Sequence, residues 1–244
     1  MKHSVLSRGA SIMAAFDGDQ PVLSLHELAT RTLLPKSTLH RLADQLCQVG
    51  WLEREHRGYR VGLRMFELGA LAAEANRLHQ AAVPHLQALA ARTGLAVHLA
   101  LLDRAEVVYL QRIAAGPVRV PTRRGGRKPA YCTALGKAIA AYDDAAAHAL
   151  SSAAMPRRTA KTITEPDALR AELEQVRAAG LALDRGEVHE DLVCVAAPVR
   201  DGGAAIGAVS VAGPASLMRW SVAGEAVREA AVAVWNATVS GPGR

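Results

Sequence analysis

The sequence predicts an α+β protein, and three patterns carry that prediction. Three helical segments precede residue 50, and a pair of short strands around a polar turn follows them. Beyond residue 94, strands alternate with helices. Because some of these strands are joined by hairpins and others by helices, we expect a largely antiparallel sheet with helices packed against it. At 244 residues the chain has room for two modest domains.

The composition excludes several classes of protein. Half of the residues are hydrophobic, which allows a packed core and argues against wholesale disorder. Charged residues interrupt the apolar runs before they reach the length of a membrane span, and the N-terminus has no secretory pattern. We therefore expect a cytoplasmic protein with no membrane partner. The formal net charge of +6 suits a polyanionic partner, although many other proteins share such a charge.

The first sixty residues predict a helix-turn-helix. Ser24 and Glu27 have the spacing of a capping box at the start of the second helix, and Pro35 suits the opening of the third. Apolar residues of the third helix recur at spacings of three and four and form one buried stripe: Leu39, Leu42, Leu46 and Val49. Hydrogen-bond donors occupy the start of the same helix: Lys36, Ser37, Thr38, His40 and Arg41. Such donors reach phosphate oxygens or guanine acceptors when a helix lies in the major groove, although Thr38 could also cap the helix locally.

A β-hairpin is predicted directly after this helix. Two apolar pairs flank a polar turn at residues 56–58: Trp51 and Leu52 before it, Tyr59 and Val61 after it. Three basic residues of the hairpin are expected on the DNA backbone or in the minor groove: Arg54, Arg57 and Arg60. A helix-turn-helix followed by such a wing predicts a winged-helix DNA-binding domain over residues 1–62.

The alternative is an ordinary pair of helices with a solvated basic face. The net charge of this region is only weakly positive, because acidic residues dilute the basic ones. However, the acidic residues Glu27 and Asp44 flank the window 31–41 without entering it. This distribution favours DNA binding.

The rest of the chain predicts a linker helix at residues 63–78 and a second domain over residues 79–240. Pro84 is expected to break or kink the helical pattern that runs from Leu63 to about Thr93. The predicted elements that follow are strands at 95–103, 106–113 and 117–123, a helix at 134–142, a helix capped by Thr164 and ended by Gly180, strands at 192–200 and 204–213, and a closing helix that carries Val222 and Val234.

The chain resembles the IclR family of bacterial transcription regulators from end to end. The matching stretches, in order, are LHELATRTLLPKSTLHRL, WLEREHRGYRVGLRMFELG, TGLAVHLALLDRAEVVYLQRI, TALGKA, TITEPDALRAELEQVRAAGLALD and CVAAPVRDGGAAIGAVSVAGPAS. The resemblance implies a regulator, repressor or activator, in which a winged helix is joined by a helix to a GAF-like effector-binding domain. It further implies homodimers that bind palindromic operator DNA and often pair into homotetramers, and an effector that is a small organic acid.

The resemblance places an effector pocket in the second domain. The start of the 134–142 helix would offer backbone N–H groups at Ala134 and Leu135, and a helix N-terminus suits a carboxylate. Asp184, Cys194 and Ser210 would line the remainder of the pocket. Because Asp184 would repel a carboxylate, we expect it to face a hydroxyl or another donor at the opposite end.

Two departures from the family pattern bear on this pocket. The family commonly has a second serine two residues after the first, where this chain has Ala212. The two positions share one face of a strand, so the pocket is more apolar here, which argues against the most polar short acids. Glu190 and Asp191 stand where a glycine is common, so the family's local geometry of the rim is not assumed at that point.

A basic loop is the third unusual feature of this domain. No acidic residue occurs between Glu106 and Asp143. The loop is either an electrostatic funnel for an anionic effector, a second surface that faces DNA, or a solvated glycine-rich loop. Its basic residues are Arg119, Arg123, Arg124, Arg127 and Lys128.

Enzymatic functions have weaker support. Cys194, with Asp184 and His189, has the residue types of a cysteine hydrolase, but nothing near a thiol among valines and alanines would lower its pKa. The three cysteines make neither a disulfide framework nor a zinc site, and no glycine-rich nucleotide motif occurs, so we expect no metal or cofactor. A non-catalytic sensor that acts through a protein partner is the remaining alternative, but it leaves the donors of the third helix unexplained. Four scattered histidines lack metal-ligand spacing: His85, His98, His148 and His189.

Overall fold

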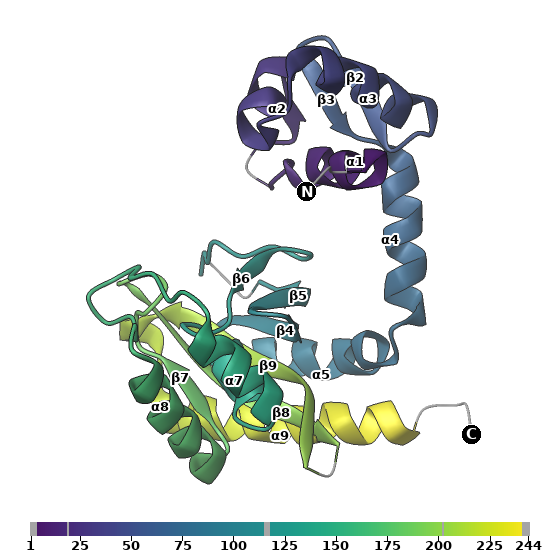
Figure 1. Cartoon of the computed structure of the whole chain (residues 1–244). Coiled ribbons are helices and arrows are strands. Elements are labelled where there is room, and N and C mark those ends of the chain that lie inside the picture. Colours follow the sequence, from purple (N-terminus) through teal and green to yellow (C-terminus); the bar gives the residue numbers. More distant parts are fainter. Residues whose placement is uncertain (1–3, 19, 115–117, 202, 241–244) are drawn as a thin grey trace. The chain divides into compact units, whose positions relative to one another are not determined.

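The computed structural model describes residues 4–18, 20–114, 118–201 and 203–240 (Figure 1). The chain divides into two compact units, residues 1–75 and residues 76–244. Helices and antiparallel sheets occur in both units, so the predicted α+β class is confirmed. No helix in the described part of the chain is long and apolar enough to cross a bilayer.

The N-terminal unit packs a bundle of short helices against a small sheet of strand order β1-β3-β2. Its core contains Ile12, Leu28, Leu39 and Tyr59, which come from separate elements. The elements are α1 (Val5–Ala14), β1 (Val22–Leu23), α2 (Leu25–Thr32), α3 (Lys36–Gln48), β2 (Leu52–Glu55), β3 (Gly58–Val61) and α4 (Leu63–Ala75).

Local contacts fix both the start of α2 and the turn between α2 and α3. The hydroxyl of Ser24 accepts the backbone N–H of Glu27, and the Glu27 carboxylate accepts the backbone N–H of Ser24 at 2.8 Å, so the predicted capping box is confirmed. Leu33 ends α2 in the left-handed region with φ 56°, and Pro35 precedes the first residue of α3.

Val49 is the exception in the predicted apolar stripe of α3: it is 57% exposed, because α3 ends at Gln48 and Val49 is its C-cap.

The predicted hairpin is confirmed. Leu52 pairs with Val61 and Glu55 with Gly58, which leaves the turn at its tip. A Cβ atom on Gly58 would lie 2.2 Å from the backbone oxygen of Leu23, so the close approach of β1 to β3 requires glycine there. We call β2, β3 and the turn between them the wing.

The helical pattern beyond the wing breaks at Asn76. A break or a kink was expected at Pro84, and the break does not occur there. The Asn76 side chain accepts the backbone N–H of His79 at 2.9 Å and caps a second helix, α5 (Arg77–Thr93). Pro84 lies inside α5. Leu78 and Leu86 of this helix are buried in the core beside it, and this packing offsets the hydrogen bond that a proline removes.

The C-terminal unit is built on one antiparallel sheet of strand order β6-β5-β4-β9-β8-β7. Both predicted hairpins, β4–β5 and β8–β9, are confirmed. The elements after α5 are β4 (Ala96–Asp103), β5 (Glu106–Ile113), β6 (Arg127–Pro129), α6 (Ala134–Ala140), α7 (Asp144–Ser152), α8 (Pro166–Ala179), β7 (Ala182–Asp184), β8 (Leu192–Asp201), β9 (Ala204–Pro214), η1 (Ala215–Leu217) and α9 (Trp220–Ser240).

The two faces of this sheet pack against different helices (Figure 1). Strand residues of alternating position, such as Val97 and Val209, form one core with α5 and α9. Residues of the opposite alternation, such as Ala100 and Ala196, form a second core with α6 and α8. The alternation therefore places His98, between Val97 and Leu99, on the α6 side.

Two expected features of this unit are wrong. Residues 118–123 form no strand, and Pro117 lies outside the described residues. The free edge of β5 is instead occupied by the following segment, since Gly125 donates its N–H to Tyr109 and β6 continues the pairing. Thr164 does not cap α8: Glu165 is the N-cap residue, and the Thr164 hydroxyl accepts a bond from Arg157. A helix was not predicted at α7.

Candidate nucleic-acid interface and ligand pocket

One side of α3 is exposed and polar, as its amphipathic pattern predicts. Leu39 and Leu42 are buried against the other helices of the N-terminal unit, which leaves the donor side facing outward. Of the side chains expected to contact DNA, Thr38 is half-buried. The exposed ones on this helix are Lys36, Ser37, His40 and Arg41.

The cations of this surface fall into two groups. In the described part of the chain, the side chains of Lys36, Arg41 and Arg57 form no hydrogen bond or ion pair. Their charges are therefore available to an external anion. Arg60 instead pairs with two carboxylates of its own wing, Glu53 at 2.6 Å and Glu55 at 3.1 Å.

Asp44 brings a carboxylate to this surface, although it lies outside the window 31–41. It pairs with Arg54 on the wing, and its other oxygen lies 3.3 Å from Nδ1 of His40, one helical turn earlier. Arg54 and Arg60 are thus weaker candidates for phosphate contact than Arg57. A reading of charge along the sequence treats all three arginines alike, because it does not show which carboxylates face them.

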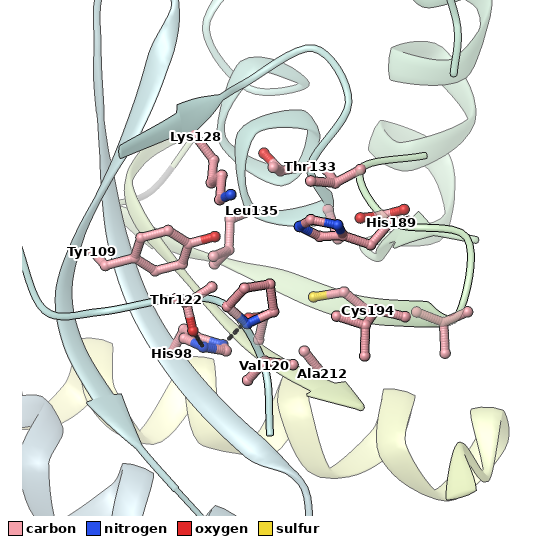
Figure 2. Close-up of a pocket in the computed structure, with 17 residues that line it drawn as sticks. His98, Tyr109, Val120, Thr122, Lys128, Thr133, Leu135, His189, Cys194 and Ala212 are labelled. Atoms are coloured by element: carbon pink, nitrogen blue, oxygen red, sulfur yellow. Dashed lines mark hydrogen bonds between the residues drawn. The ribbon is translucent and has the colours of Figure 1, made fainter. Parts of the chain in front are cut away.

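A pocket opens on the α6 side of the second sheet, with about 500 Å³ of empty space, part of it open to solvent (Figure 2). All positions that the family resemblance assigned to the effector line this one pocket: Ala134, Leu135, Asp184, Cys194, Ser210 and Ala212. Polar residues outside the predicted effector set also line it: His98, Tyr109, Thr122, Lys128, Thr133 and His189.

Strand register gathers these residues. Asp184 on β7 lies opposite Cys194 on β8, and Cys194 lies opposite Ala212 on β9. One step along the same face, Ser210 on β9 lies opposite His98 on β4. Because residues directly opposite one another in a sheet share a face, the four strands present these side chains to one space.

The start of α6 forms another wall of the pocket. The Thr133 hydroxyl accepts the N–H of Gly136 at 3.1 Å, whereas the N–H groups of Ala134 and Leu135 make no hydrogen bond to a described residue. A Cβ atom on Gly136 would lie 2.2 Å from the oxygen of Ala130, so glycine lets the preceding loop approach the helix. The TALG motif therefore leaves two unpaired donors facing a cavity.

His98 organises the polar end of the pocket. Its Nε2 lies 2.8 Å from the Thr122 hydroxyl, its Nδ1 lies 3.4 Å from the Ser210 hydroxyl, and its ring is 5.2 Å from that of Tyr109 (Figure 2). Complete burial, with a smaller effect of Arg112, lowers the pKa of His98 to about 3. The ring is therefore neutral and bridges two hydroxyls. Strand alternation, which puts His98 on the α6 face of β4, was the signal available in the sequence.

Asp184 is held by the main chain. Its Oδ1 accepts the N–H of Gly186 at 3.0 Å and that of Glu187 at 2.6 Å, and burial raises its pKa. The same carboxylate therefore shapes the turn that leads to Val188 and His189, two further lining residues. Whether it also faces a donor on an effector stays a prediction.

The chemistry of the pocket disfavours a cysteine nucleophile. Burial raises the pKa of the Cys194 thiol to about 12, so little thiolate exists at neutral pH. His189 has a lowered pKa, chiefly through burial, and it is neutral there. Within the described ranges, no three potential metal ligands gather at one place.

Comparisons with known proteins agree on one family. Residues 5–56 match the IclR helix-turn-helix domain, and residues 70–236 match the C-terminal domain of bacterial transcriptional regulators of the IclR type. The chain is 34% identical over 203 residues to the HTH-type transcriptional regulator KdgR of Escherichia coli (strain K12), covering 81% of this chain and 77% of that protein. It is 29% identical over 200 residues to the Pca regulon regulatory protein of Pseudomonas putida, covering 80% and 69%.

Solved structures give the same result. An IclR homologue from Microbacterium hydrocarbonoxydans, complexed with 4-hydroxybenzoate, has a TM-score of 0.87 at 30% identity, covering 97% of this chain and 100% of that one. A regulator from Alicyclobacillus acidocaldarius shares the fold, with a TM-score of 0.85 at 24% identity. With both family domains matched in order, the chain belongs to the IclR family of bacterial transcription regulators, with an N-terminal helix-turn-helix domain and a C-terminal ligand-binding domain.

Proposed function

We propose that this regulator binds palindromic operator DNA as a homodimer, and that a small aromatic acid in the C-terminal pocket modulates that binding. The observation that carries the proposal is the pair of features on one chain: an exposed donor face on α3, with cations that pair with no described residue, and a cavity in the second unit that the predicted effector residues line. Catalysis has no part in it.

On the DNA side, α3 of each protomer enters the major groove, and the two helices lie roughly 34 Å apart, one turn of B-DNA. Arg41 and Lys36 are the cations of this helix without a carboxylate partner in the described residues, which supports base and phosphate contacts. Ser37, Thr38 and His40 supply further donors. Arg57 at the tip of the wing reaches the backbone or minor groove, with Arg54 and Arg60 in supporting positions.

Self-association is supported by the surface of α4. None of the residues of this helix is buried in the single chain, and Leu63, Phe66 and Leu71 are each more than 60% exposed. Exposed apolar side chains at helical spacing suit a second copy of the same helix. The dimer would be the unit that reads a palindrome, and pairs of dimers would form tetramers.

On the effector side, both apolar and polar side chains line the pocket, as an acid with an apolar body requires. Ala212 stands where the family often has a hydroxyl, which favours a ring over the most polar short acids. A structural neighbour was solved with 4-hydroxybenzoate, which supports the same class of ligand. Effector binding can change DNA affinity only if the dimer has two arrangements of its DNA-binding domains and the effector binds one of them more tightly than the other.

The proposal is tested by retardation of the protein's own upstream DNA, with and without a panel of aromatic and aliphatic acids. We expect retardation by the protein alone and a change of affinity with at least one aromatic acid. Absence of retardation by the full chain would exclude this DNA as its operator, and retardation that no acid alters would remove the effector part.

Arg41→Ala should weaken operator binding roughly 5- to 150-fold, because a guanine contact is worth about 1–3 kcal/mol. The matched control is Arg64→Ala on α4, since Arg64 is also exposed but pairs with Glu67 at 2.6 Å. Titration of labelled operator at fixed salt measures both variants. If the Arg41 variant binds the operator as tightly as the Arg64 variant and with the same sequence preference, Arg41 is not one of the residues that contact bases.

A further inference from the structure

We propose that Lys128 determines the specificity of the pocket by pairing with the carboxylate of the effector, so that the site selects anions over neutral analogues. The inference rests on the proposed function, because it assigns a role within the same cavity. Lys128 belongs to the basic loop, for which neither the family match nor the resemblance supplies a role.

Strand alternation turns Lys128 inward. On β6, Lys128 lies opposite Val107, a fully buried residue of β5, and Tyr109 shares that face two residues later. The neighbouring Arg127 points the other way and pairs with Asp103 and Glu106 at the turn of the β4–β5 hairpin. These outward ion pairs hold β6 in place and leave the Lys128 ammonium directed into the cavity (Figure 2).

Lys128 is a cation without a counter-ion. The side chain is half-buried, lines the cavity, and forms no ion pair or hydrogen bond with any residue that the structure describes. Removing an ammonium partly from water without a partner is unfavourable. A carboxylate that enters the cavity supplies that partner, so charge pairing adds to the affinity for acids.

The other titratable groups of the cavity do not compete for this role. His98 is buried and neutral, and His189 has a lowered pKa through burial and the nearby charges of Lys128 and Arg158. Asp184 directs Oδ1 to backbone N–H groups and makes no ion pair with Lys128. Lys128 is therefore the cation of this cavity at neutral pH, among the lining residues described.

The test compares a matched pair of probes on the full chain by isothermal titration calorimetry: 4-hydroxybenzoate and its neutral amide, 4-hydroxybenzamide. The wild type should bind the acid more tightly than the amide. Lys128→Gln should lower the affinity for the acid roughly 10- to 100-fold, as expected for loss of a charge-assisted hydrogen bond, and leave the amide unchanged. Lys128→Arg should keep the preference for the acid.

Arg124→Gln is the matched control, because Arg124 lies in the same loop, is exposed, and does not line the cavity. It removes the same charge and should change the affinity for the acid less than threefold, by long-range screening alone. Thermal unfolding of both variants verifies that the fold is kept.

Unchanged affinity of Lys128→Gln for the acid, or an equal loss for acid and amide, overturns the inference and leaves the proposed function in place. If the wild type retards its operator but binds the acid no more tightly than the amide, the assignment of Lys128 and the proposed effector class are both overturned.

Discussion

Lys137→Met is expected to lower the free energy of unfolding by about 3–5 kcal/mol, the typical effect of removing one partner from a buried ion pair. Lys137 on α6 is fully buried, and its Nζ donates to Glu187 at 2.6 Å and to Glu172 at 3.0 Å. Methionine fills similar space but leaves the buried Glu187 carboxylate without its cation. Urea denaturation monitored by circular dichroism measures the change.

The loss should also depend on pH, with a sign set by Glu187. Burial raises the pKa of this carboxyl from 4.5 to about 7, even though Lys137 opposes the rise. In the wild type, the protonated Glu187 carboxyl therefore stabilises the folded state. This contribution is complete below about pH 4.5 and is lost as the pH rises through about 7. Without Lys137 the pKa rises further, so the carboxyl is neutral at pH 5.5 and the variant should lose less stability there than at pH 8.

Lys161→Met is the matched control, because Lys161 is exposed and the chemical change is identical. Its stability should stay within about 0.5 kcal/mol of the wild type at both pH values. If the two variants unfold alike, or if the Lys137 variant loses the same stability at pH 5.5 and pH 8, the buried pair does not hold α6 in the way the distances imply.

Elements whose cause is local could be predicted from the sequence. Ser24 and Glu27 form their capping box within three residues, and the alternation of β8 and β9 is visible along each strand. Errors arose where packing outweighed a local rule. Pro84 stays inside α5 because the helix is packed on its apolar side, and residues 118–123 are not a strand because the edge of β5 is already occupied.

The pocket was predicted by resemblance and could not have been found by spacing. Asp184, Cys194 and Ala212 are brought together by pairing of three strands, and nothing in the intervals between them encodes that register. Lys128 was visible only as one of a group of basic residues. Lys137, a charge within an otherwise apolar helix, was a signal for a buried pair, but its partners lie 35 and 50 residues away.

Asp184→Ala is expected to abolish the response to acids and also to destabilise the second unit. The substitution leaves the N–H groups of Gly186 and Glu187 without their acceptor, and each unsatisfied buried donor costs about 1–3 kcal/mol, so the total is roughly 2–6 kcal/mol. The freed turn carries Val188 and His189, so the pocket loses part of its wall. Operator binding without effector should persist, since the reading helix belongs to the other unit.

Asp184→Asn separates the two roles that this carboxylate can have. An asparagine oxygen can still accept both backbone N–H groups, so the unfolding free energy should stay within about 1 kcal/mol of the wild type if the main-chain contacts are what matter. Effector titration then isolates the charge: removing the negative charge opposite an incoming carboxylate should leave the affinity for an acid equal or higher. If the asparagine and alanine variants are equally destabilised, the negative charge of Asp184, and not its hydrogen bonds with Gly186 and Glu187, stabilises this end of the pocket.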